Sequence, residues 1–237
     1  MRTLLLALAL APLAATANEG AALPQQSWSF EGLRAHWNKA EIYRGYQVFT
    51  QVCMACHSAK YISHRDMMRV GFTEAEVQAL AKGLNMGLND KLKTGLLEED
   101  AIGSYGKMPP DLSMMNKARQ GLANYTYAVL TGYSQDPEAI HHAFPNGVPE
   151  GAHFNTAFAG NAIAMPNPLP NADMVTYDDG TKATVEQMAK DVTVFMQWTA
   201  EPERIDRQHL GVYVLLYLAL FTALAYATKR MIWKDVH

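Results

Sequence analysis

Cysteine is scarce in this chain: only Cys53 and Cys56 occur among its 237 residues. A zinc site built on this pair would need two further histidine or carboxylate ligands. A thioredoxin-like redox pair would give no reason for the histidine that follows at position 57. The sequence also lacks an internal repeat, and Cys53–His57 is its single C-x-x-C-H motif. We therefore expect one site built on the two cysteines.

Excess positive charge is absent as well. Residues 18–208 carry 16 Lys and Arg against 22 Asp and Glu, a net charge of about −6. This balance argues against a nucleic-acid partner, which requires the opposite sign. An acidic face would instead attract a basic soluble partner and speed its encounter. The segment 134–191 contains only two lysines and eight acidic residues: Asp136, Glu138, Glu150, Asp173, Asp178, Asp179, Glu186 and Asp191.

The five residues from Cys53 to His57 form the motif C-x-x-C-H, by which c-type haem is attached to proteins. Two thiols at this spacing can each bond one vinyl-derived carbon on the same porphyrin edge. His57 is then placed to bring an imidazole nitrogen to the iron as its fifth ligand. The motif therefore predicts one covalent haem c, and it uses both Cys53 and Cys56, leaving no cysteine for a disulfide.

Both ends of the chain carry targeting signals. Residues 1–17 begin with Arg2, continue with an apolar run and end in small residues, which is typical of a secretory signal peptide. A second run, Gly211–Ala227, is uncharged, and with its neighbours it is nearly long enough to cross ~30 Å of hydrocarbon. Lys229, Arg230 and Lys234 follow it, which places the C-terminus in the cytoplasm.

These signals predict a single-pass protein of a bacterial-type inner membrane, anchored in membrane lipid, with its main domain in the periplasm. The predicted organisation is a signal peptide at 1–17, a periplasmic domain at 18–208, a transmembrane helix at 209–229 and a short cytoplasmic tail at 230–237.

Hydrophobic periodicity within the periplasmic domain predicts a mainly α fold with long irregular loops. The segments 83–113 and 132–180 are rich in Gly, Pro and Asn and are expected to be largely loop. The expected helices span 38–52, 73–82, 117–131 and 184–200. The first and last of these helices are expected to cross closely, with Gly45 and Phe49 against Phe195 and Trp198. The contact lies either beside the haem or within an ordinary hydrophobic core, and the sequence alone does not separate the two.

The sixth iron ligand decides between electron transfer and ligand chemistry. Methionine is favoured, because a thioether stabilises ferrous iron and none of the other histidines has a local signature of ligation. The spacing from His57 favours Met108, or Met114 and Met115, whereas Met165 lies in a second proline-rich loop. The residues alone leave these candidates equal.

Several motifs spread along the chain resemble those of the cytochrome c1 family, the haem subunit of the quinol–cytochrome c reductase (cytochrome bc1) complex. They are Tyr43–Phe49 before the haem motif, Met108–Ser113, Ala118-Arg119, Leu130–Tyr133, Ala162–Met165, Tyr177–Thr181 and Ala189–Val192 running to Ala200–Glu203. The resemblance implies a cytochrome c-like haem domain with Met165 as the axial ligand, Pro110 near the haem and Arg119 facing a propionate. The chain departs from the family in having Ala164 where glycine is common.

The resemblance also implies a function. The haem would take an electron from the Rieske iron–sulfur protein and pass it to a c-type cytochrome, within a dimeric complex that contains cytochrome b. The subunit would belong to an enzyme without having a catalytic residue of its own. The main alternative is a membrane-tethered c-type cytochrome of another respiratory oxidoreductase, but the linker at about 203–209 is short for a mobile tether. A haem gas sensor or a peroxidase would need an open sixth position.

Overall fold

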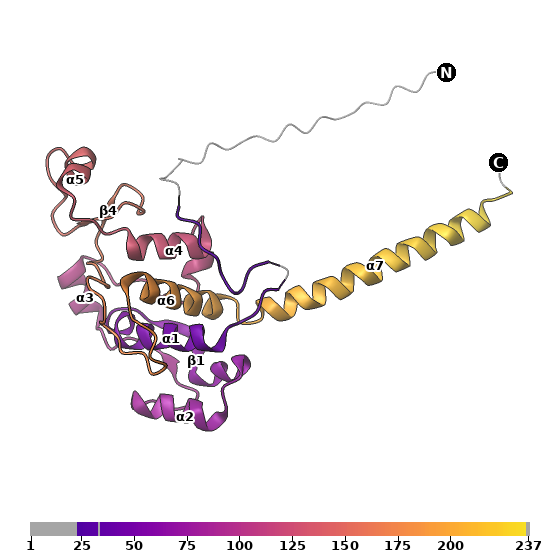
Figure 1. Cartoon of the computed structure of the whole chain (residues 1–237), viewed down its shortest axis with the longest axis horizontal. Helices are drawn as coiled ribbons and strands as arrows, with labels where there is room; N and C mark the ends of the chain where they lie inside the picture. Colours follow the sequence, from indigo (N-terminus) through magenta and orange to yellow (C-terminus); the bar gives the residue numbers. More distant parts are fainter. Residues whose placement is uncertain (1–22, 33, 236–237) are drawn as a thin grey trace, which may run out of the picture.

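The computed structural model describes residues 23–32 and 34–235, and it shows a mainly helical domain from which one long helix extends (Figure 1). The predicted signal peptide lies outside the described residues. The mainly α fold class is confirmed. The helices are α1 Lys39–Gln51, α2 Glu74–Gly83, α3 Glu98–Tyr105, α4 Leu122–Thr131, α5 Pro137–Ala143, α6 Val185–Ala200 and α7 Arg204–Ile232, with short 3-10 turns η1 Cys53–Ala55, η2 His64–Val70 and η3 Met115–Lys117.

Two small antiparallel strand pairs connect the helices. Strand β1 (Ala59–Ser63) pairs with β2 (Lys91–Leu92), with Ala59 opposite Leu92. Strand β3 (His153–Phe154) pairs with β4 (Ala162–Ile163), with His153 opposite Ile163. The first pair stabilises the chain just after the C-x-x-C-H motif, and the second stabilises the loop that leads to Met165.

Helix α6 is the centre of the domain and lies between α1 and α4 (Figure 1). The predicted close crossing of α1 and α6 is present at Gly45. A Cβ atom on Gly45 would overlap the carbonyl oxygen of Asp191 and lie 2.6 Å from the Cβ of Phe195. The Phe49 ring centroid is 5.4 Å from that of Phe195, which is 5.8 Å from Trp198. Only glycine permits this approach, which brings the aromatic rings into contact.

A buried ion pair reinforces the same crossing. The Arg44 guanidinium donates to both carboxylate oxygens of Asp191, at 2.9 and 3.1 Å, and to Asp179 at 2.8 Å. The Asp191 side chain is fully buried. Burial raises the pKa of Asp191, and the hydrogen bonds from Arg44 and Gln187 oppose that rise. The pair ties α1, α6 and the loop at 177–181 together.

The segments 83–113 and 132–180 are largely loop, as predicted, but each contains one short helix, and one expected helix begins later than predicted. Helix α3 lies within 83–113, which was expected to be largely loop; acidic residues in its first turn favour its N-terminus and Gly106, at φ +71°, ends it. Helix α5 likewise lies within 132–180, with Asp136 as its N-cap. The helix expected from 117 begins at Leu122, because Gly121 has a left-handed φ of +85° and interrupts the chain before it.

The segment expected to link the domain to its anchor is also different: α7 begins at Arg204 and includes most of it. Only Glu201–Glu203 separate α6 from α7. The Glu201 carboxylate accepts hydrogen bonds from Lys117 (3.1 Å), Arg204 (3.0 Å) and Arg207 (2.6 Å). The cations lower the pKa of Glu201 although its partial burial opposes the shift. The anchor is therefore joined to the domain by an ion-paired turn rather than by a flexible linker.

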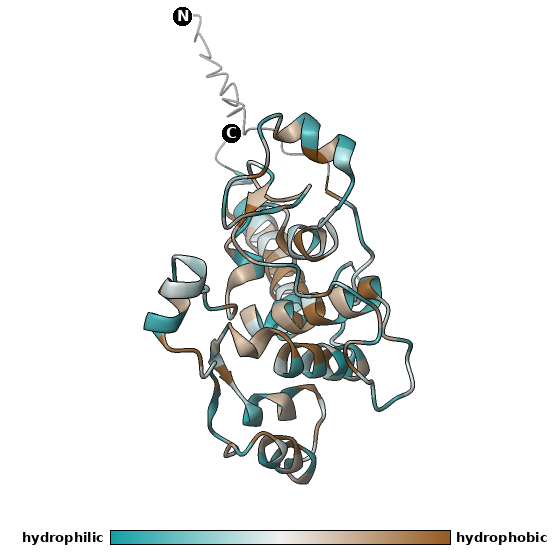
Figure 2. Ribbon diagram, turned by 90° about the vertical axis from the view of Figure 1, so that its left-hand side faces the viewer, coloured by the Kyte–Doolittle hydropathy of each residue, from teal (hydrophilic) through white to brown (hydrophobic). Residues whose placement is uncertain are grey.

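Among the described residues, α7 is the one helix long and apolar enough to cross a membrane. Its 29 residues span about 43 Å at 1.5 Å per residue, more than the ~30 Å of hydrocarbon. The helix extends away from the domain (Figure 1), and its apolar side chains are exposed on every side. Figure 2, which looks roughly along α7, shows hydrophobic residues in the central helices and hydrophilic residues on the surrounding loops.

Candidate haem-binding site

The C-x-x-C-H motif forms a single helical turn at the end of α1. The backbone N–H groups of Cys56 and His57 donate to the carbonyl of Cys53, at 3.1 and 2.8 Å. Because residues three and four positions apart share a helical face, the two thiols and the imidazole lie on the same side of the turn. All three side chains are partly exposed. This arrangement suits one planar group attached through both sulfurs and ligated by the histidine.

The tautomer of His57 is fixed by the proline motif. Its Nδ1 lies 2.7 Å from the carbonyl oxygen of Pro110. A carbonyl can only accept a hydrogen bond, so Nδ1 carries the proton and the lone pair of Nε2 is available to a metal. Burial lowers the pKa of His57 and favours the neutral ring. Sequence reasoning expected Pro110 beside the haem, and it missed this contact with His57, the predicted fifth ligand.

Asp111, which belongs to the Met108–Ser113 motif, makes contacts that sequence reasoning did not predict. Its carboxylate accepts hydrogen bonds from the backbone N–H of Lys60 (3.0 Å) and of Ser113 (2.9 Å). The N–H of Leu112 also donates to the carbonyl of Ser58, at 2.7 Å. These bonds hold the proline motif against the chain that follows His57. No spacing rule could have revealed them, since the two segments lie about fifty residues apart.

The alternative uses of the two cysteines find no support. Burial raises the pKa of the Cys53 thiol to about 12, so Cys53 itself is not a reactive thiol of lowered pKa. Within residues 23–32 and 34–235, no three His, Cys, Asp or Glu side chains gather closely enough to hold a metal ion. The Cys56 sulfur lies 3.9 Å from the hydroxyl of Tyr105 on α3, a helix absent from the prediction.

The candidate sixth ligands differ in how they are held. Met165 follows β4 and is half-buried, and its carbonyl oxygen accepts a hydrogen bond from the Tyr133 hydroxyl at 2.9 Å. Met108 and Met114 are exposed, and Met115 packs against the hydrophobic core. Met165 is therefore the candidate whose backbone is fixed by a contact from a distant element.

Arg119 lies on the exposed surface between η3 and α4. Its guanidinium donates to the carbonyl of the neighbouring Ala118 at 3.0 Å, and no carboxylate among the described residues pairs with it. The charge is free for an anionic group such as a haem propionate. Together with the ligand-ready Nε2 of His57, this donor set fits a covalently attached haem.

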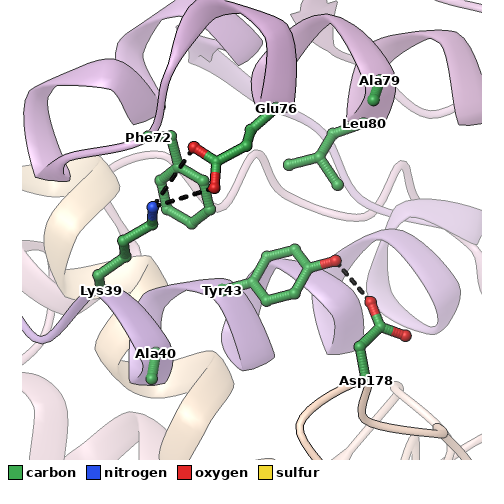
Figure 3. Close-up of a pocket in the computed structure, with 8 residues that line it drawn as sticks. All are labelled: Lys39, Ala40, Tyr43, Phe72, Glu76, Ala79, Leu80 and Asp178. Atoms are coloured by element: carbon green, nitrogen blue, oxygen red, sulfur yellow. Dashed lines mark hydrogen bonds and ion pairs between the residues drawn. The ribbon is translucent and has the colours of Figure 1, made fainter.

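A groove of about 590 Å³ lies elsewhere, between α1 and α2 (Figure 3). Across it, Lys39 lies 4.2 Å from the Phe72 ring centroid and pairs with Glu76 at 3.3 Å. On its other side the Tyr43 hydroxyl donates to Asp178 at 2.6 Å. The groove contains none of the candidate haem residues, so it is a separate surface feature.

Comparison with known proteins decides the family. A model described as the cytochrome C1 family matches residues 28–236. The chain belongs to the cytochrome c1 family. Cytochrome c1 of Rhodospirillum rubrum is 38% identical, over 94% of this chain and 92% of the relative. An Arabidopsis thaliana relative named cytochrome c1 2, heme protein, mitochondrial, is 39% identical over 92% of this chain and 74% of its own. A Candida albicans relative is 36% identical over 93% of this chain and 80% of its own, and it is named the cytochrome b-c1 complex catalytic subunit, mitochondrial.

These matches confirm the predicted cytochrome c1 resemblance. They also confirm the predicted cofactor, because this family carries covalently bound haem c. The individual roles assigned to Cys53, Cys56, His57, Met165, Arg119 and Pro110 stay predictions, and the geometry above is what supports them.

Proposed function

We propose that this chain is the electron-transfer haem subunit of a respiratory quinol–cytochrome c reductase. It takes one electron at a time from the Rieske iron–sulfur protein and passes it to a c-type cytochrome. The observation that carries the proposal is the hydrogen bond from His57 Nδ1 to Pro110, which leaves Nε2 free for iron inside a C-x-x-C-H turn of a cytochrome c1 family member.

The proposed roles of the residues follow from their placement. Cys53 and Cys56 hold the haem covalently, and His57 and Met165 ligate its iron. The carbonyl of Pro110 fixes the orientation of the His57 ring, and the free guanidinium of Arg119 neutralises a propionate. When bound, the haem supplies a one-electron redox couple. The protein moves no proton and forms no bond to a substrate, so no residue of this chain is catalytic.

The membrane arrangement supports a fixed rather than a travelling haem. Helix α7 crosses the inner membrane, with the haem domain in the periplasm and the tail after Lys229 in the cytoplasm. The three residues Glu201–Glu203 are too few and too firmly paired to let the domain swing. This favours a subunit that sits on cytochrome b in a dimeric complex over a free-standing tethered cytochrome. The name of the C. albicans relative points the same way.

An acidic surface favours a basic acceptor. Asp173 and Asp178 are exposed on the loop before α6 and have no cationic partner among the described residues, whereas Asp179 pairs with Arg44. The two carboxylates belong to a domain of net charge about −6. Opposite charges accelerate encounter, and salt screens this attraction between charges that lie farther apart than a Debye length of ~8–10 Å. We expect electron transfer to a basic c-type cytochrome to slow as ionic strength rises. A rate independent of salt would remove the argument for this surface.

Purification in mild detergent tests the proposal as a whole. We expect the chain to be isolated together with cytochrome b and a Rieske protein, and the preparation to reduce a c-type cytochrome with quinol. Isolation without those two proteins would contradict the complex and favour the tethered alternative. Stoichiometric carbon monoxide binding by the reduced protein at neutral pH would instead indicate an open sixth position, as in a gas sensor.

A further inference from the structure

The loop that carries Met165 has no covalent brace. Both cysteines belong to the haem motif, so neither can form a disulfide in this loop, and β3 and β4 contribute only two residues each. A loop with so little regular structure needs other contacts to hold a sulfur in place. Hydrogen bonds to the end of α4 supply them.

The first of these bonds acts on the ligand residue itself. The Tyr133 hydroxyl, two residues beyond α4, donates to the carbonyl oxygen of Met165 at 2.9 Å. Tyr133 is half-buried. Because the bond is made to the backbone, it fixes the position of Met165 while leaving its thioether free to face a ligand.

The second set of bonds is centred on Asn155, which is fully buried. Its Nδ2 donates to the carbonyl of Val129 in α4 at 2.8 Å, and its Oδ1 accepts from the N–H groups of Ala157 (3.0 Å) and Phe158 (3.1 Å). Asn155 also forms an isolated antiparallel bridge with Tyr133. One side chain therefore ties the turn after β3 to the helix that precedes Tyr133.

Gly132 makes this close approach possible. A Cβ atom there would lie 2.6 Å from the carbonyl oxygen of Ala128 and 3.0 Å from both Asn155 Oδ1 and Thr156 Oγ1. The carbonyl of Gly132 accepts from the N–H of Thr156 at 2.9 Å. Because Gly132 has no side chain, the turn at Asn155 and Thr156 packs directly on the end of α4. This packing fixes the position of the next residue, Tyr133.

We propose that Tyr133 is a positioning residue for the axial ligand: its hydroxyl, supported by the Asn155 turn, holds the backbone of Met165 so that the thioether stays on the iron. The inference rests on the proposed ligation by Met165. Without the hydroxyl, the half-buried Met165 carbonyl loses its partner, and the loop gains freedom at the residue that must stay fixed. The iron–sulfur bond is then easier to displace, by up to about tenfold for one hydrogen bond.

Tyr133→Phe tests this in the full-length, haem-loaded chain in detergent micelles. Imidazole is titrated into the oxidised protein, where it competes for the sixth position, and the dissociation constant is read from the visible spectrum. We expect Tyr133→Phe to bind imidazole up to about tenfold more tightly than wild type. The matched control is Tyr127→Phe on α4, whose hydroxyl makes no hydrogen bond within the described residues and whose ring packs on Trp28; it should bind imidazole like wild type.

A urea titration of each variant separates positioning from general destabilisation. If Tyr133 acts by positioning, the imidazole affinity changes in Tyr133→Phe and stays at the wild-type value in Tyr127→Phe, even where the two variants lose similar free energy of unfolding. An unchanged imidazole affinity, or an equal change in Tyr127→Phe, overturns the inference. Met165→Leu distinguishes this failure from failure of the proposed ligation: if it too leaves the spectrum and the imidazole affinity unchanged, Met165 is not the ligand.

Discussion

The crossing of α1 and α6 at Gly45 gives a sharp test of the fold that holds the haem motif. In Gly45→Ala the added methyl group would overlap the carbonyl oxygen of Asp191 and lie 2.6 Å from the Cβ of Phe195. Both neighbours are backbone or backbone-attached atoms and cannot rotate away. The two helices must therefore separate, which strains the buried contact between Arg44 and Asp191 as well.

The magnitude is the difference between two opposing effects. Overpacking of a core costs about 1–3 kcal/mol, and contact with rigid atoms favours the upper part of that range. Alanine in a helix gains about 0.5–1 kcal/mol over glycine. We expect a net loss of about 2 kcal/mol in the free energy of unfolding. Gly103→Ala is the matched control, since Gly103 lies in α3 with no atom within 4 Å of an added Cβ; it should be neutral or stabilising by up to ~1 kcal/mol.

Urea unfolding of the haem-loaded, full-length protein in detergent measures the difference. Tryptophan fluorescence follows the unfolding; Trp198, on α6 in contact with Phe195, contributes to it together with three other tryptophans. With a urea m-value of about 2 kcal/mol/M, the Gly45→Ala midpoint should fall by about 1 M. If Gly45→Ala unfolds at the wild-type midpoint or above it, as Gly103→Ala should, the close approach described here is wrong.

Two further predictions concern ion pairs. Arg44→Met leaves the Asp191 carboxylate buried without its cation and should lower the unfolding free energy by about 3 kcal/mol. Arg69→Met, the control, removes an exposed ion pair with Glu203 and should lower the unfolding free energy by less than ~1 kcal/mol. Equal losses in the two variants would contradict the buried ion pair. The pKa of Glu201 is lowered from its ordinary 4.5, so its stabilising contribution is present above that pH and lost as pH falls through the lower folded-state value. Glu201→Gln should therefore be less stable to unfolding at pH 7 by about 1–2 kcal/mol. Between pH 5 and 3, acid unfolding curves should show that it loses less stability than wild type. If wild type and variant lose stability equally over this range, the ion pairs of Glu201 do not stabilise the turn between α6 and α7.

The sequence predicted the features that depend on local pattern. The C-x-x-C-H motif, the amphipathic helix ending at Ala200 with Thr184 as its cap, and the uncharged run in α7 each carry their signal within a few turns of chain. For the same reason the fold class followed from the sequence. The close approach at Gly45 was predicted from the similarity to small c-type cytochromes, in which glycine lets the first and last helices cross closely.

The features that escaped prediction depend on contacts between distant segments. The carbonyl of Pro110 meets His57 across fifty-three residues, and Tyr133 meets Met165 across thirty-two. Backbone carbonyls leave no mark in a sequence, so spacing could not separate Met108 from Met165. Helix α3 was missed for a different reason: its two flanking glycines and short length resembled loop composition, and its acidic first turn was the only signal for it.

The optical spectrum and redox titration of Met165→Leu beside wild type show whether Met165 is the sixth ligand of the haem iron. Methionine ligation of ferric haem gives a weak band near ~695 nm and a raised reduction potential. We expect wild type to show this band, and Met165→Leu to lose it and to have a sharply lower potential. A variant with the wild-type spectrum and potential would contradict ligation by Met165, and would place the sixth ligand on another residue, with Met108 the first to examine.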